Sequence, residues 1–327
     1  MNNMNIKNEN IAFLKKHLAR FISYKRAQGY KYKANEESLN RFIKFLVGFG
    51  LTENRLSKEL ILEYARKRPY ETPKNNANRV SDLKQFTIYL NEHGYEAYIP
   101  AVSKCSSAFV PYIFTHDEIL RIFQAVDKLR PNPCYNSAVV YPVLFRMLYG
   151  CGLRISEALD LKVGDVDLNK GVLTIKKSKY DRDRLIPMSE SLNSICKRFH
   201  KKIHKNSSEN DYFFKNKNSS RRSRGTVYDR FREILWSSGI PYCGRGKGPR
   251  LHDLRHVFCC HSLKEISDKG IDLYCALPVL STYLGHSSIK ATEKYLRLTK
   301  ELYPDILKRT DNITSYVYPE VYKDEAY

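Results

Sequence analysis

A histidine and an arginine three residues apart, His252 and Arg255, are of types that could act on a phosphate. Apolar residues spaced three to four apart over 251–258 predict a helix over 252–263 with an apolar stripe. On such a helix His252 and Arg255 share one face. A group that transfers protons would then lie beside a cation that binds two oxygens at once, which suits a phosphodiester.

A second arginine, Arg154, lies where one predicted helix ends at Gly152 and another starts near Ile155. A helix N-terminus there would point amide donors outward. The flanks are strongly apolar, which predicts a partly buried guanidinium, and buried arginines are rarely unpaired. Glu157, one turn further on, could hold it in place. The alternative is a surface arginine on a loop.

A charged loop with a lysine joins two predicted strands. The strands cover 172–176 and 184–187, and Lys179 lies between them. A lysine on this hairpin could reach a reacting group and then withdraw. The alternative is a solvated hairpin tip.

His286 and Tyr295 lie on either side of a predicted helix break. Gly285 suits the C-cap of a helix that begins around Leu277-Pro278, and a serine after His286 suits the next N-cap. Nine residues of unbroken helix would place His286 and Tyr295 on opposite sides, so the break lets them converge. The alternatives are a capping or packing histidine, and a tyrosine of core or surface among the 24 in the chain.

The first hundred residues predict a small bundle of four helices. Apolar residues recur at helical spacing over 11–21, 39–46, 58–67 and 80–90, and Thr72-Pro73 suits an N-cap followed by proline. Its basic surface would grip phosphates or form ordinary solvated helix faces. The residues expected to bind DNA here are Lys15, Arg20, Lys25, Arg26, Lys74 and Arg79.

Periodicity lapses over 99–111, which predicts an interdomain linker. Thr115-His116-Asp117-Glu118 then forms a capping box, and further helices follow over about 138–149, 190–202 and 227–238. We expect a mainly α fold with a small antiparallel β-sheet. The predicted units are a helical domain at 1–98, the linker at 99–111, a second domain at 112–310 and a C-terminal tail at 311–327.

Two basic loops lie in the second domain, at 215–224 and 244–250. Each could be a flexible solvated loop, a DNA-tracking arm, or both. The second is glycine-rich, but it lacks the spacings of nucleotide-binding loops. The residues expected to bind DNA from these loops are Arg221, Arg222, Arg224, Arg245, Lys247 and Arg250.

Composition points to a polyanionic partner. The net charge is +21, with 56 basic against 35 acidic residues.

The sequence has no run of eighteen apolar residues and no hydrophobic signal core, so we expect a cytoplasmic, nucleoid-associated protein that does not enter membranes. The eight cysteines lack zinc spacing and read as reduced thiols, so we expect no metal. A nucleophilic Cys151 remains an alternative.

Five motifs in order resemble those of the tyrosine recombinase (phage integrase) family. The resemblance covers nearly the whole chain: the helical bundle resembles the family's core-binding domain, and about 110–310 its catalytic domain. One departure is Tyr180, which replaces the glycine usual beside the hairpin lysine. The matching motifs are Gly152-Leu153-Arg154-Ile155-Ser156-Glu157, Lys179, His252-x-x-Arg255, Leu284-Gly285-His286 and Tyr295.

The resemblance implies a covalent reaction at a DNA phosphate. Tyr295 would attack in line and give a 3′-phosphotyrosine link and a free 5′-hydroxyl. His252 would accept the phenolic proton, and Lys179 would protonate the leaving 5′-oxygen. The phosphotyrosine stores the bond energy, so the step is reversible without ATP.

The resemblance also implies how charge is stabilised. Arg154 and Arg255 would clamp the non-bridging oxygens, His286 would donate a hydrogen bond to the phosphate, and Glu157 would support the arginines from behind. No cofactor or metal is expected, because no carboxylate cluster suggests a magnesium site.

The implied function is site-specific recombination of double-stranded DNA for a mobile element, by a homo-oligomer, expected to be a tetramer, on DNA. A related recombinase or a host accessory protein could take part. The implied C-terminal helix would dock on a neighbouring protomer or fold back on its own domain. The alternatives are a type IB topoisomerase, a catalytically silent DNA-binding accessory protein, and a hydrolase built on Cys151.

Overall fold

The computed structural model describes residues 2–49, 51, 53–104, 110–132, 136–176, 183–241, 244, 248–286 and 288–302. The chain divides into two compact units, Met1–Phe109 and Val110–Tyr327. This division falls inside the segment that the sequence predicts as a linker. Each unit has hydrophobic core residues of its own, and none of the described helices is long and apolar enough to cross a membrane.

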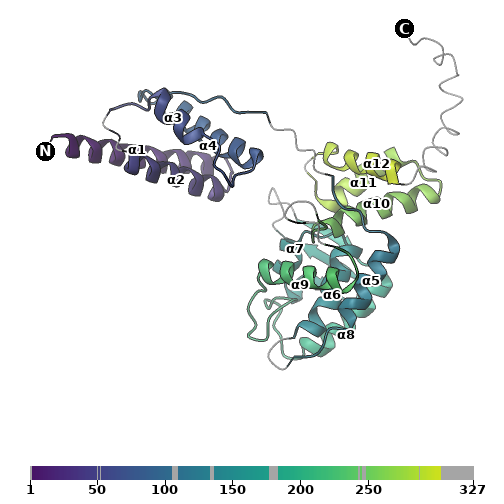
Figure 1. Ribbon diagram of the computed structural model, residues 1–327. Coiled ribbons are helices and arrows are strands. Elements are labelled where there is room, and N and C mark those ends of the chain that lie inside the picture. The colour runs from purple at the N-terminus through teal and green to yellow at the C-terminus, as the bar shows by residue number, and fades with distance from the viewer. Residues whose placement is uncertain are drawn as a thin grey trace, which may run out of the picture. The chain divides into compact units, whose positions relative to one another are not determined.

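The described residues of the N-terminal unit form four helices, as predicted (Figure 1). Its core includes Leu14, Phe42 and Phe86, all fully buried. The predicted cap is confirmed, because the Thr72 hydroxyl accepts a hydrogen bond from the Asn75 amide at 3.2 Å. The helices are α1 (Asn2–Ala27), α2 (Lys33–Phe49), α3 (Lys58–Ala65) and α4 (Pro73–Glu92).

The C-terminal unit begins with a capped helix and continues as a mainly helical body. The capping box is confirmed: Thr115 Oγ1 accepts from the Glu118 amide at 3.1 Å, and the Glu118 carboxylate accepts from the Thr115 amide at 2.8 Å. The helices of this body are α5 (His116–Asp127), α6 (Ser137–Gly150), α7 (Ile155–Asp160), a 3₁₀ turn (Val163–Asp165), α8 (Glu190–Ile203) and α9 (Arg224–Ser237).

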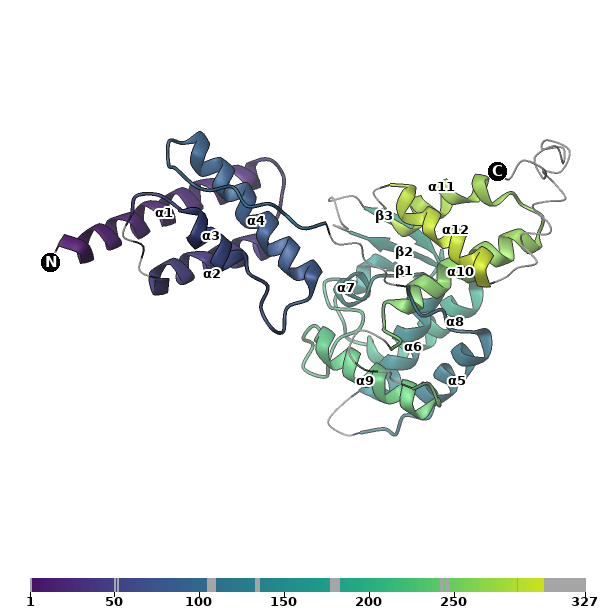
Figure 2. The same ribbon diagram turned by 45° about the horizontal axis from the view of Figure 1, so that its top comes forward.

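A three-stranded antiparallel sheet lies in this unit, in the order β1-β2-β3 (Figure 2). The strands are β1 (Val166–Asp167), β2 (Val172–Ile175) and β3 (Arg184–Pro187). Leu173 pairs with Ile186, both buried, while Ile175 pairs with Arg184. The two predicted strands are confirmed. β1 was not predicted, because two residues are too few to show alternation.

Three helices gather at one end of the C-terminal unit and share a separate cluster of buried residues (Figures 1 and 2). They are α10 (Asp253–Asp268), α11 (Leu273–Leu284) and α12 (Lys290–Leu302). The cluster includes Cys259, Leu263, Leu277 and Tyr295. α11 also contacts β3, so this end of the unit joins the helices to the sheet.

The start of α11 differs from the prediction. The sequence suggested Leu277-Pro278, but the helix begins one turn earlier, at Leu273. Asp272 supplies the cap, since its side chain accepts a hydrogen bond from the Tyr274 amide at 2.7 Å. Pro278 lies inside the helix on its exposed face, where water can satisfy the carbonyl that loses its helical partner.

Candidate active site

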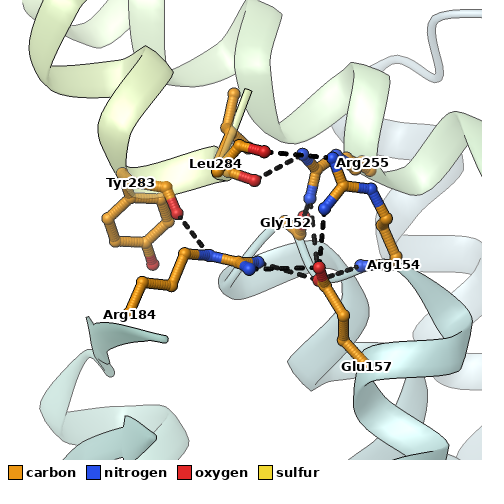
Figure 3. Close-up of polar contacts among 8 residues, drawn as sticks. Gly152, Arg154, Glu157, Arg184, Arg255, Tyr283 and Leu284 are labelled. Atoms are coloured by element: carbon orange, nitrogen blue, oxygen red, sulfur yellow. Dashed lines mark hydrogen bonds and ion pairs between the residues drawn. The ribbon is translucent and has the colours of Figure 1, made fainter. Parts of the chain in front are cut away.

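Glu157, in the first turn of α7, contacts three guanidinium groups (Figure 3). Its carboxylate lies 2.6 Å from Arg154 and forms a two-pronged pair with Arg184 at 2.8 and 3.1 Å. Arg255 approaches the same carboxylate to 3.9 Å. Burial favours the neutral acid, but hydrogen bonds and charges from Arg184 and then Arg154 lower the pKa of Glu157 overall. One carboxylate therefore neutralises part of a strongly positive cluster.

The last turn of α11 holds the same arginines through three successive backbone carbonyls (Figure 3). These carbonyls have no helical partner, because they lie at a helix C-terminus, where the dipole favours cations. These hydrogen bonds fix the position of each arginine relative to the turn that carries His286. The pairs are Tyr283 with Arg184 at 3.0 Å, Leu284 with Arg255 at 2.7 Å, and Gly285 with Arg154 at 3.3 Å.

Gly285 ends α11 in the left-handed conformation, with φ of 66°. A Cβ at this position would lie 3.1 Å from Nη1 of Arg184, so the arginine side chain packs directly against the glycine. Any side chain here would be strained and would crowd that arginine. The predicted C-cap is thus confirmed.

Arg255 is almost completely buried, with 2% of its side chain exposed. Besides Leu284, it donates to the Gly152 carbonyl at 2.7 Å. Gly152 approaches closely because it lacks a side chain: a Cβ there would lie 2.5 Å from the Phe258 ring. Burial and then the neighbouring Arg154 lower the pKa of Arg255 to about 10. The guanidinium stays charged at neutral pH and is fixed in orientation.

His252 and His286 are half-buried beside these arginines. Burial and then Arg255 lower the pKa of each imidazole to about 4, so both rings are neutral at pH 7. His286 Nδ1 lies 2.7 Å from the Thr292 hydroxyl in the first turn of α12. This contact fixes the ring in the turn where the sequence placed it.

Tyr295 lies on α12 with only 2% of its surface exposed. Its ring is nearly parallel to that of His286, at 16°, with the centroids 6.2 Å apart. Burial raises the pKa of the phenol, while Arg255 opposes this shift. The break between α11 and α12 therefore brings His286 and Tyr295 together, as the spacing predicted.

The hydroxyl of Tyr295 meets a histidine that the sequence analysis did not select. His256 Nδ1 lies 2.7 Å from this oxygen. The family resemblance gives the proton of Tyr295 to His252, whose ring instead packs edge-on against that of His256, with the centroids 4.8 Å apart. Spacing places His256 one helical turn beyond His252 on α10, but it does not show the contact with Tyr295, which depends on how α10 and α12 pack.

Arg184 is the other site residue that the sequence analysis missed. The sequence indicates only that it begins a strand, whereas its side chain joins β3 to both Glu157 and Tyr283. The hairpin lysine, Lys179, lies outside the described residues, as do Arg245 and Lys247. The described ends of the hairpin place its base beside α11.

The basic residues expected to bind DNA do not form one exposed set. Arg79 and Arg222 are buried, at 6% and 5% exposure. Arg79 pairs with Glu71 at 2.7 Å, and Arg222 lies against the Tyr141 ring at 5.2 Å, so each guanidinium has partners inside the protein. The partly buried residues are Lys25, Arg221 and Arg250, and the exposed ones are Lys15, Arg20, Arg26, Lys74 and Arg224.

The domain that holds these arginines is similar to a known protein family. The profile of the phage integrase family matches residues 113–301, which is more than half of the chain. The chain belongs to the phage integrase family. The members of this family are tyrosine-type site-specific recombinases, and the match spans every described residue of the arginine cluster.

Curated relatives in the family match most of the chain. A putative integrase/recombinase, y4rB, of Sinorhizobium fredii is 28% identical over 299 residues, covering 89% of this chain and 95% of its own. The tyrosine recombinase XerD of Listeria monocytogenes is 26% identical over 290 residues, covering 85% and 91%. The similarity therefore extends beyond the matched domain into the N-terminal unit.

Solved structures show the same fold. The integrase of the transposon Tn1549, in complex with a circular intermediate DNA, aligns with a TM-score of 0.63 and 18% identity, over 86% of this chain and 94% of its own. A lambda integrase dimer bound to a core site aligns at 0.61 and 20% identity, over 86% and 76%. The mainly helical architecture with its small sheet is that of tyrosine recombinases.

Proposed function

We propose that this protein cuts and rejoins DNA through a 3′-phosphotyrosine intermediate on Tyr295. The observation that carries the proposal is the convergence of two arginines, Arg154 and Arg255, with His286 at the end of α11, where the Tyr295 ring lies 6.2 Å from the His286 ring. These side chains come from four separate helices or helix ends. A phosphodiester is the substrate that fits such a set.

The arginines would supply the charge stabilisation. Attack on a phosphodiester builds negative charge on the non-bridging oxygens, and fixed guanidiniums stabilise that charge without reorganising. Arg255 is held rigidly by two carbonyls, at 2.7 Å each, whereas Arg154 makes a longer contact of 3.3 Å with Gly285. Arg154 is therefore the arginine that can most readily exchange a carbonyl for a phosphate oxygen.

The neutral histidines suit hydrogen bonding to a phosphate. With pKa values of about 4, His252 and His286 need not lose a proton to act as donors through one nitrogen and acceptors through the other. A bound phosphate would offset the surrounding positive charge. The proposed roles are phosphate contact for His286, acceptance of the phenolic proton for His252, and protonation of the leaving 5′-oxygen for Lys179.

The biological setting is proposed from the relatives. Three of the four named relatives are called integrases, one of them putative and one from a transposon, which supports a role in moving an element by integration, excision or transposition. Structures of relatives bound to DNA support double-stranded DNA as the partner.

We place the N-terminal domain at 1–98 on the DNA as a clamp, followed by the linker at 99–111 and the catalytic domain at 112–310. A tetramer on DNA and a nucleoid location complete the proposal. The tail at 311–327 lies outside the described residues.

Two alternatives make different use of the same fold. A type IB topoisomerase would relax supercoils without site preference, and a silent accessory protein would bind DNA without forming adducts. A hydrolase built on Cys151 is disfavoured, because burial raises the pKa of that thiol to about 12 and leaves it protonated.

The function is tested with DNA from either side of the gene. Two such ends are placed on one plasmid, and the protein is assayed for recombinant products and for relaxation of a plasmid without the ends. Recombination that requires both ends supports the proposal, and terminal inverted repeats in that DNA would indicate a mobile element. Relaxation of either plasmid without recombinants would favour the topoisomerase.

A further inference from the structure

The hydroxyl of Tyr295 and the imidazole of His256 form a buried hydrogen bond between α12 and α10. The distance from His256 Nδ1 to the phenolic oxygen is 2.7 Å, and the residue His256 is 6% exposed. The ring centroids are 5.4 Å apart. The Cys259 thiol approaches the same hydroxyl from α10.

We infer that His256 is a catalytic residue, the group that accepts the phenolic proton when Tyr295 attacks. This inference rests on the proposed function and changes the assignment of its proton acceptor. A general base must lie within hydrogen-bond reach of the proton it takes, and His256 meets this condition. His252 is then left to contact the phosphate.

Asp253 lies on the other side of the His256 ring. Its carboxylate oxygen is 3.9 Å from Nε2, one helical turn away on α10. Asp253 is fully buried and is held by the Arg250 amide at 2.8 Å and the Arg250 guanidinium at 3.1 Å. A carboxylate on this side favours the tautomer with hydrogen on Nε2, which leaves Nδ1 free to accept, and it stabilises the imidazolium that forms.

The proton transfers balance in both directions. As the Tyr295 oxygen bonds to phosphorus, its proton moves to Nδ1 of His256, and the bond from phosphorus to the 5′-oxygen breaks. The leaving oxygen takes a proton from its own acid, which we propose to be Lys179. In the rejoining step a 5′-hydroxyl attacks and gives its proton to Lys179, the tyrosine oxygen leaves, and His256 returns its proton to that oxygen.

The surroundings keep His256 neutral in the resting protein. Burial, then the charges of His252, Lys294, Arg250 and Arg255, lower its pKa to about 3. A neutral ring can accept a proton, but with this pKa the imidazolium needs nearby negative charge, which Asp253 and a bound DNA phosphate would supply.

The first test compares two buried histidines of α10. His256→Asn keeps a polar side chain that cannot take up a proton, and His261→Asn is the matched control, because His261 is 9% exposed and contacts Tyr149 instead. Single-turnover formation of covalent adduct on a nicked DNA substrate should slow about 100-fold or more in H256N. H261N should react at the wild-type rate, with DNA affinity equal in both. An unchanged or faster rate in H256N would show that His256 only restrains Tyr295, and would overturn the inference.

The second test separates proton transfer from packing. Fluorotyrosine at position 295 has a more acidic phenol and depends less on a base, so the ratio of the wild-type rate to the H256N rate should shrink severalfold. A ratio that stays the same overturns the inference even if H256N is slow. Tyr295→Phe is measured in parallel. Adducts that persist in this variant would contradict the proposed function itself. Loss of adducts in Tyr295→Phe, together with a fast H256N, would contradict only the role of His256.

Discussion

Arg184 and Glu157 form a two-pronged ion pair, at 2.8 and 3.1 Å, that joins the base of the β-hairpin to α7 in the interior of the protein. Both side chains are less than a tenth exposed. Arg184 also donates to the Tyr283 carbonyl at 3.0 Å, so one side chain connects β3, α7 and α11. The pair fixes the carboxylate that Arg154 and Arg255 share.

We expect Arg184→Met to lower the free energy of unfolding of the protein by about 3 kcal/mol, because it leaves a buried carboxylate with poorer partners. Arg146→Met is the matched control. Arg146 makes a similar pair with Asp127 at 2.6 Å, but that carboxylate is half exposed, so its loss should cost less than about 1 kcal/mol. Urea unfolding measures both variants, and equal losses would contradict the interior role of Arg184.

Gly285→Ala should impair cleavage, and Gly270→Ala should not. Both glycines have positive φ, 66° and 73°, so each substitution should cost about 1 kcal/mol of stability through backbone strain. Only at Gly285 would the new Cβ crowd a side chain, that of Arg184 at 3.1 Å; nothing lies within 4 Å at Gly270. Adduct formation measured beside thermal unfolding separates the two effects. Parallel losses of activity would show that the turn at Gly285 matters for folding alone.

Arg154→Ala and Arg255→Ala should each slow adduct formation by about 100-fold or more, as expected for a group that stabilises transition-state charge. Their effects on stability should differ. Arg154 is 24% exposed, whereas Arg255 is 2% exposed and satisfies two carbonyls that would lose their donor. Chemical unfolding should therefore show the larger loss for Arg255→Ala. A larger loss for Arg154→Ala would mean that the carbonyls are satisfied in another way.

The protein should lose stability in mild acid because of its buried histidines. The pKa values of His252, His261 and His286 are about 4, well below the value near 6.5 of an unfolded chain. Between these values the unfolded state binds more protons, so stability is fully present above about pH 6.5 and falls as the pH drops toward 4. Unfolding in urea at pH 7 and pH 5 should show the loss. His261→Gln should reduce the difference, and an unchanged difference would contradict the buried state of His261.

The elements of the fold follow from the sequence where local signals are strong. The caps at Thr72 and Thr115, the two strands and the break at Gly285 all rest on nearby residues, and the structure has each of them. The start of α11 was missed because Pro278 reads as a helix start. Nothing in the sequence shows that a proline on an exposed face is tolerated inside that helix.

The site could be predicted only in part. Spacing suggested that His286 and Tyr295 converge, and their rings do stack. It could not reveal that Arg184 reaches Glu157, 27 residues away, or that His256 reaches Tyr295, 39 residues away, because these contacts depend on tertiary packing. The burial of two residues expected to bind DNA could not be predicted for the same reason. Arg79 and Arg222 look like surface cations in the sequence, but they lie inside the protein.

The central claim is that Tyr295 attacks the DNA. A nicked substrate, from which the fragment beyond the cleaved phosphate diffuses away, should trap wild-type protein as a covalent adduct, and the modified peptide should contain Tyr295. Tyr295→Phe should form no adduct while binding the same DNA with unchanged affinity, and Tyr283→Phe should still form it. An adduct that persists in Tyr295→Phe, or a modified peptide that maps to another residue, would contradict the account.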